Sequence, residues 1–136
     1  MQQLDSWELL PYLNKRRDDL NKALTIAKER GIELAAAEQK YRVEKRKAIL
    51  LAKHNGEKVS LIMELVNGDE IISQLRYERD VAKTLYASAT EAINIYKLDC
   101  RLVEAQIARD WDKNAEKDTI KSQNKTGFKE AIKQEK

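Results

Sequence analysis

The chain has 136 residues, of which 36% are charged and 6% aromatic, with four glycines and one proline. So few turn-forming residues leave little material for a β fold, whereas abundant Ala, Glu, Lys, Leu and Arg favour long helices. The net charge of +3 at pH 7 is too small to indicate a nucleic-acid-binding protein by itself.

The composition also bears on the cellular compartment. No apolar run approaches the ~20 residues of a membrane-spanning helix, and no signal-peptide core follows Met1. The single cysteine, Cys100, cannot form an internal disulfide, which favours a reducing compartment. We therefore expect a cytoplasmic protein without membrane association.

An apolar heptad pattern begins near Tyr12 and predicts a long first helix, preceded by a short lead-in over residues 1–11. The pattern passes Gly31 without a change of register, although a glycine inside a helix costs about 1 kcal/mol relative to alanine. One long helix and two helices meeting at Gly31 both remain open, and the composition favours continuity. The predicted seam contains Leu13, Leu20, Leu24, Ala27, Gly31, Leu34, Tyr41, Ala48 and Ala52.

The first helix is expected to end at the His-Asn-Gly sequence of residues 54–56, because glycine readily takes the positive φ of a helix C-terminus. A short helix follows, with Ser60 as its candidate N-cap and the Asn-Gly pair at residues 67–68 as its end. Asp69 is the candidate N-cap of the next helix, since a carboxylate suits the positive end of the helix dipole.

The next predicted helix carries the most regular apolar pattern in the chain, interrupted only at Arg79. Five heptads of this kind are typical of a coiled-coil-like helix. A helix from Asp69 to Trp111 would be about 65 Å long, so its apolar face needs the first helix or a partner chain to cover it. The predicted seam contains Ile72, Leu75, Ala82, Tyr86, Ala89, Ile93, Tyr96, Cys100, Val103 and Ile107.

Together these elements predict an all-α fold: a long antiparallel helical hairpin, coiled-coil-like, in a domain over residues 1–112. Val43, Ile49 and Leu50 project away from the seam of the first helix. Apolar side chains in several directions indicate burial on more than one side of that helix. Two helices of one protomer do not provide this burial, so we expect a homo-oligomer.

Residues 113–136 differ in composition, with a lysine at every fourth position from Lys113 to Lys133 and interspersed Asn, Ser, Thr and Gly. As a helix this segment would form a ridge of lysines, and as a free chain it would be a flexible basic arm. We expect the second form: a flexible basic C-terminal tail, with the preceding helix ending near Trp111.

No catalytic or metal-binding motif is recognisable in the sequence. The only histidine, His54, is expected at a helix C-terminus, where a structural role is commoner than a catalytic one. Cys100 lies on the predicted seam and is interpreted as a small core residue. Neither a glycine-rich phosphate loop nor a metal-ligand cluster occurs. We therefore expect a protein that is not an enzyme and has no cofactor.

Positive charge is concentrated between residues 40 and 58, which contain seven Lys or Arg and two Glu. Most of these cations lack an acidic partner four residues away within the segment. A solvated helix face is the commoner explanation of such a run. The basic tail and the repetition of each patch in an oligomer instead favour contact with a phosphate backbone. The candidate nucleic-acid-binding residues are Lys40, Arg42, Lys45, Arg46, Lys47, Lys53 and Lys58.

A basic helix ending at a glycine-containing break, a short connecting piece and a long second helix resemble phage recombination mediators of the UvsY type, over roughly residues 32–111. The Lys-Ala-basic-Leu motif that contacts DNA in that family is similar to KAIL at residues 47–50, where Ile49 replaces the second basic residue. The resemblance implies a small helical protein that assembles into rings, binds single-stranded DNA and helps a recombinase displace single-strand-binding protein.

The string LVNGDEIISQLRYERDVAKTLYASATEAINIYKLDCRLVEAQIARDW also resembles small proteins of phages of Gram-positive bacteria. We therefore expect a non-enzymatic single-stranded DNA-binding accessory protein of phage recombination or replication, in the host-cell cytoplasm. The expected partners are single-stranded nucleic acid, further copies of the chain, and a recombinase or single-strand-binding protein. The alternative is a phage protein whose coiled coil binds another protein or inhibits a host factor.

Overall fold

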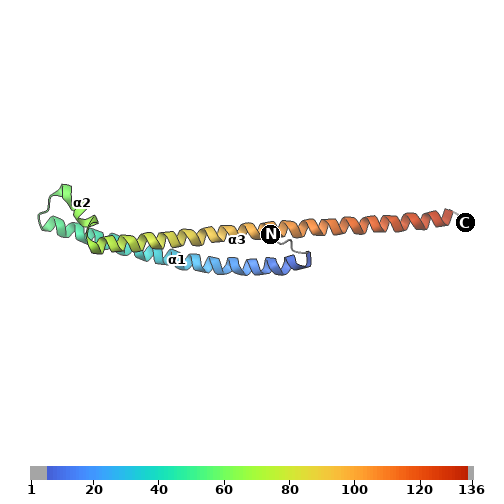
Figure 1. The fold of residues 1–136 in the computed structure, drawn as a ribbon, viewed down its shortest axis with the longest axis horizontal. Helices are drawn as coiled ribbons and strands as arrows, with labels where there is room; N and C mark the ends of the chain where they lie inside the picture. The colour runs from blue at the N-terminus through green and yellow to red at the C-terminus, as the bar shows by residue number, and fades with distance from the viewer. Residues whose placement is uncertain (1–5, 135–136) are drawn as a thin grey trace. The chain divides into compact units, whose positions relative to one another are not determined.

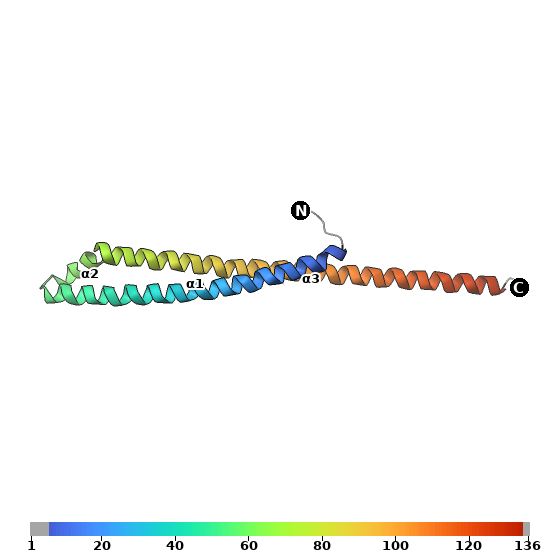
Figure 2. The same cartoon turned by 90° about the horizontal axis from the view of Figure 1, so that it is seen from below.

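The computed structural model describes residues 6–134, and side chains are described for residues 7–124. Three helices follow one another in the chain: α1 (Ser6–His54), α2 (Val59–Asn67) and α3 (Glu70–Gln134). Figures 1 and 2 show α1 and α3 side by side, with α2 where the chain turns back. The described part of the chain contains no strand, so the all-α prediction is confirmed, and α1 packs on α3 as expected.

α1 is a single helix of 49 residues, so the alternative of two helices meeting at Gly31 is wrong. The glycine lies where α1 approaches α3, and a Cβ added to it would come within 3.2 Å of Cε2 of Tyr86. The absent side chain makes room for this ring. α1 also starts earlier than predicted, at Ser6, with Pro11 inside the helix and only five residues after its start.

The predicted break after α1 is confirmed, and its hydrogen bonds explain why it occurs there. The N–H of Gly56 donates to the carbonyl of Lys53 (3.1 Å), and the N–H of Glu57 donates to the carbonyl of Ala52 (3.2 Å). Gly56 has φ of 78°, a left-handed conformation that costs a residue with a Cβ about 1–2 kcal/mol. These bonds satisfy carbonyls that the helix end would otherwise leave free.

The start of α2 differs from the prediction. Its N-cap is Lys58, whose side chain makes no capping hydrogen bond, and Ser60 lies inside the helix. The predicted Ser60 cap is therefore wrong, because the chain enters α2 two residues earlier. The end of α2 at Asn67, followed by Gly68, is as predicted.

The start of α3 is capped as predicted. Oδ1 of Asp69 accepts hydrogen bonds from the N–H groups of Ile71 (2.9 Å) and Ile72 (3.1 Å). These two bonds satisfy two of the four donors that a helix start leaves unpaired. The carboxylate also lies at the positive end of the helix dipole.

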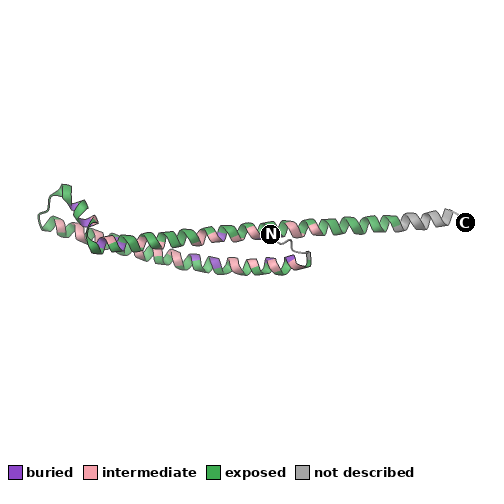
Figure 3. Cartoon of the chain, in the orientation of Figure 1, coloured by how far each residue is buried: buried purple, intermediate pink, exposed green. Residues whose placement is uncertain are grey.

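The end of α3 corrects the sequence prediction. The helix continues to Gln134, so the predicted end near Trp111 is wrong. No proline lies beyond that residue, and the Ala, Glu, Lys and Gln content of the segment supports helix formation. Residues 112–124 are exposed, as Figure 3 shows, whereas the side chains of Lys125, Lys129 and Lys133 lie outside the described residues. That the segment is flexible, as a tail distinct from residues 1–112, remains a prediction.

The contacts divide the chain into two units. Unit 1 comprises Met1–Asp19 and Tyr96–Lys136, and unit 2 comprises Leu20–Ile95. The core of unit 1 is a cluster of buried side chains from α1 and α3: Leu9, Leu13, Cys100 and Val103, with Tyr12 and Ile107 packed against it. The prediction that Cys100 is a core residue is confirmed.

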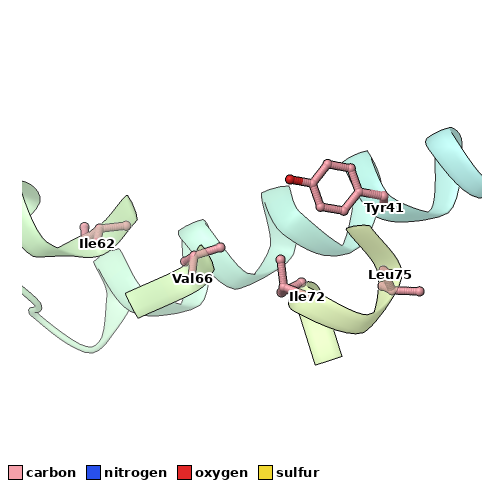
Figure 4. Close-up of a cluster of buried hydrophobic side chains, with 5 residues drawn as sticks. All are labelled: Tyr41, Ile62, Val66, Ile72 and Leu75. Atoms are coloured by element: carbon pink, nitrogen blue, oxygen red, sulfur yellow. The ribbon is translucent and has the colours of Figure 1, made fainter. Parts of the chain in front are cut away.

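The core of unit 2 brings together all three helices. Tyr41 of α1, Ile62 and Val66 of α2, and Ile72 and Leu75 of α3 form one buried cluster, shown in Figure 4. The short helix α2 thus covers apolar residues at the end of the α1–α3 packing.

Most predicted seam residues of α3 are buried or half-buried, although Tyr86 is 38% exposed. On α1, Leu24 is 46% exposed and the neighbouring Ala23 is buried instead.

Candidate functional site

Four of the seven candidate cations line one hollow of about 340 Å³ on the surface of α1. At 100° per residue the four cations project within about 100° of one another, so they lie on one side of the helix. Two apolar side chains line the hollow with them. This surface, called the basic groove below, consists of Arg42, Lys45, Arg46, Ile49, Leu50 and Lys53.

The cations of the basic groove differ in how they are paired. Arg42 forms an ion pair with Glu38 at 2.9 Å, and its side chain remains 75% exposed. The expectation that the cations lack i,i+4 partners is therefore wrong for Arg42, because Glu38 precedes the basic segment. Arg46 and Lys53 are exposed and form no ion pair among the described residues. An exposed pair contributes about 0–1 kcal/mol, so a phosphate group can replace Glu38.

The side chain of Lys45, which lines the basic groove, contacts Tyr41. Its Nζ lies 3.4 Å from the hydroxyl of Tyr41, to which it donates, and 5.5 Å from the centre of the ring. The guanidinium of Arg79, from α3, lies 4.6 Å from the same ring centre and donates twice to Asp80 (3.1 and 2.9 Å). The ring is 6% exposed and has a cation at its face, so it cannot stack on a base. Its expected role in core packing is confirmed.

The three remaining candidates do not line the basic groove. Lys40 is exposed elsewhere on α1, and Lys47 pairs with Glu44 at 3.4 Å. Lys58 lies beyond the break, at the N-terminal flank of α2. The structure therefore separates the candidates into a group of four on one face and three dispersed cations.

Two apolar residues, Ile49 and Leu50, line the basic groove and are not among the seven candidate site residues. Ile49 is half-buried and packs against the core of unit 2, whereas Leu50 is exposed. Their apolar character predicted surface for self-assembly, and the resemblance placed both in the KAIL sequence of residues 47–50. The signal that identifies them is their spacing of three or four residues from Arg46 and Lys53, which places them on the same face of α1.

A second charged cluster, in unit 1, is structural. The Nε atom of Arg16 donates to the Tyr12 hydroxyl (3.0 Å) and pairs with Asp99 (2.8 Å), and the Tyr12 hydroxyl donates to Asp99 (3.1 Å). The hydrogen bond with Tyr12 raises the pKa of Arg16 above its ordinary value, and Asp99 and Asp19 raise it further, while burial opposes them. The guanidinium already has protein partners, so this cluster links α1 to α3 and does not offer a binding site.

Over the residues that the structure describes, no group of three or more His, Cys, Asp or Glu is arranged to hold a metal ion. Among the described helices, none combines the length and the apolar character needed to cross a bilayer.

No protein-family model, curated protein sequence or solved structure matches the chain. The function of the basic groove is therefore inferred from its geometry and chemistry.

Proposed function

We propose that this protein is a non-enzymatic accessory protein of phage recombination or replication that binds single-stranded DNA through the basic groove. The observation that supports this proposal is the convergence of four cations on one face of α1, around Ile49 and Leu50. Two of these cations, Arg46 and Lys53, have no ion pair in the described part of the chain.

Phosphate contacts explain how such a groove would bind a nucleic acid. From Arg42 to Lys53 the face extends about 16 Å along α1 at 1.5 Å per residue, which allows contact with several phosphates. Each neutralised phosphate of a single strand releases counterions and adds about −0.7 to the slope of log affinity against log salt. Contacts from all four cations would give a slope of about −3.

The apolar part of the groove favours a single strand over a duplex. The exposed Leu50 side chain can contact the face of an unstacked base, whereas the bases of a duplex are stacked on one another. The described groove has no aromatic side chain on which a base could stack. The binding is therefore proposed to be independent of sequence and to depend mainly on charge.

The proposed accessory role includes self-assembly. A homo-oligomer repeats the basic groove once in each subunit, so that weak contacts add along one strand. The resemblance to UvsY-type mediators extends the proposal to a recombinase or a single-strand-binding protein as a partner in the host-cell cytoplasm.

The test is the binding of fluorescent oligo-dT, measured by anisotropy at ~50 mM salt and during a salt titration. Reversing two groove charges in R46E/K53E should weaken binding at least about 10-fold and make the salt dependence less steep. The matched control is K22E/K28E, which makes the same change of net charge at exposed lysines elsewhere on α1. Absence of binding by the wild-type protein, or equal weakening in both variants, would contradict the proposal.

A second candidate function, protein interaction, is favoured by the surface of α2. Leu61, Met63 and Leu65 are exposed beside the buried Ile62 and Val66, so apolar side chains cover most of the circumference of α2. Exposed apolar patches of this kind commonly mark interaction sites. In this alternative a phage or host protein covers α2. Recovery of one stoichiometric protein from nuclease-treated lysate, lost in L61D/L65D, would support it over DNA binding.

A further inference from the structure

α3 carries a second apolar face, which α1 does not cover. Ile95, Leu98 and Leu102 are 58%, 57% and 59% exposed, and Ala105, the next residue in the pattern, is exposed too. Their steps of three and four residues place them within about 80° of one another. They project roughly opposite the buried side chains of the same helix, such as Cys100. These four residues are called the outer stripe.

We propose that the outer stripe packs against the outer stripe of a second copy of this chain, with the two α3 helices antiparallel. The alternating three- and four-residue spacing is the spacing that a partner helix requires for packing in a coiled coil. A two-fold axis level with residue 100 brings Leu98 opposite Leu102 of the partner subunit, and Ile95 opposite Ala105 of the partner subunit. Ile95 then faces the smaller Ala105, Leu98 faces Leu102, and each contact occurs twice, as in an isologous interface.

The charges beside the outer stripe favour the same arrangement. Glu91 and Arg109 are exposed and lie on the line of the stripe, one at each end. In the antiparallel arrangement Glu91 meets Arg109 of the partner subunit at both ends of the contact. A parallel arrangement would instead place Glu91 beside Glu91 of the partner subunit, and Arg109 beside Arg109 of the partner subunit. Charges at the edge of an interface determine orientation and partner choice more than affinity.

Two further residues show the same complementarity. Lys97 and Glu104 flank the stripe on one side, and the antiparallel register brings Lys97 within one residue of the level of Glu104 of the partner subunit. The side chain of Glu104 keeps 48% exposure while it pairs with Arg17 of its own chain. The spacing of the apolar residues and the charges beside them are therefore complementary to those of the same surface, which identifies the occupant as a second copy.

This inference rests on the proposed self-assembly but not on DNA binding, because no residue of the outer stripe lines the basic groove. The first test is light scattering of the purified full chain without nucleic acid. The wild-type protein should have at least twice the mass of the 15.7 kDa monomer. Leu98→Glu places a carboxylate in the contact twice per dimer and should raise the dissociation constant at least about 100-fold.

The matched control is Ile32→Glu, which changes a comparably exposed apolar residue of α1 and should leave the mass unchanged. Circular dichroism establishes that both variants keep their helical content. A monomeric wild-type protein would overturn both the stripe and self-assembly, whereas oligo-dT binding would still be tested separately by R46E/K53E. An assembly that Leu98→Glu leaves intact would overturn the stripe alone.

The orientation is tested by charge reversal. Glu91→Arg and Arg109→Glu should each weaken the dimer about 3- to 10-fold, because each places two like charges together at both ends of the contact. The double variant E91R/R109E restores opposite charges and should recover most of the wild-type affinity. Additive weakening in the double variant would overturn the antiparallel arrangement.

Discussion

Units 1 and 2 both pack α1 on α3, but different interactions hold their helices together. In unit 1, charged side chains cross from helix to helix: Arg16 reaches Asp99 at 2.8 Å, and Arg17 reaches Glu104 at 2.9 Å. In unit 2 the contact is mainly apolar, and α2 adds Ile62 and Val66 to the buried cluster.

This difference bears on where the protein can bind a ligand. The half-buried Arg16 of unit 1 is occupied by Tyr12 and Asp99. In unit 2 the helices are held together mainly by buried apolar side chains. Arg46 and Lys53 can therefore remain exposed, and neither forms an ion pair with a carboxylate among the described residues. A cation without a structural role is available for a phosphate, which is why the candidate site lies in unit 2.

The largest expected effect comes from removing apolar burial in unit 2. Ile62→Ala deletes most of a side chain that is 3% exposed and should lower the free energy of unfolding by about 2–4 kcal/mol. Leu61→Ala, at an exposed position next to it, should cost less than about 1 kcal/mol. Urea denaturation measures both. Equal losses would show that α2 does not pack through Ile62 and Val66.

A smaller effect is expected from removing the charged link of unit 1. Arg16→Met keeps the length of the side chain but leaves Asp99 with only the Tyr12 hydroxyl, so stability should fall by about 1–2 kcal/mol. High salt should reduce the difference between variant and wild type, whereas the loss in Ile62→Ala should persist. Urea titrations at low and high salt test this contrast, and a salt-independent loss would contradict the electrostatic explanation.

The raised pKa of Arg16 determines the expected pH dependence of this link. A pKa that is higher in the folded state gives stabilisation that is complete below the unfolded value and is lost only as the pH rises through the folded value. Because the ordinary pKa of arginine already lies far above neutral pH, Arg16 should contribute equally from neutral to mildly alkaline pH. Urea denaturation of the wild type and Arg16→Met at pH 7 and pH 8.5 should show the same difference, and a difference that shrinks at the higher pH would contradict this explanation.

The smallest expected effect on stability concerns the basic groove. The double variant R46A/K53A should change the free energy of unfolding by no more than about 0.5 kcal/mol, because both side chains are exposed and neither forms an ion pair among the described residues. Thermal unfolding should therefore give nearly the wild-type midpoint, while oligo-dT binding weakens. A clear loss of stability would show that these cations support the fold, and would remove the distinction between the two units.

The features that the sequence predicted correctly depend on neighbours along the chain. The break after His54 needs a residue that takes positive φ, and Gly56 supplies it. The start of α3 needs an acceptor close to its first N–H groups, and Asp69 supplies it. The α3 seam follows from the spacing of its apolar residues, which is visible without any partner.

The wrong predictions have local causes as well. The lysine-rich segment after Trp111 has few apolar residues, which is compatible with a free chain, but its residues also have good helix propensity and α3 continues through them. Glu38, the partner of Arg42, lies just before the basic segment, and its separation of four residues from Arg42 makes the pair predictable from the sequence.

The sequence by itself determined that the chain is helical, where α1 ends and which face of α3 is apolar, because each depends on residues within a few positions of one another. Only the tertiary structure decided that Arg79 of α3 lies on the Tyr41 ring, whose hydroxyl accepts a hydrogen bond from Lys45. Residues 41 and 79 become neighbours only through the register of α1 against α3, and packing of side chains distant in the sequence sets that register.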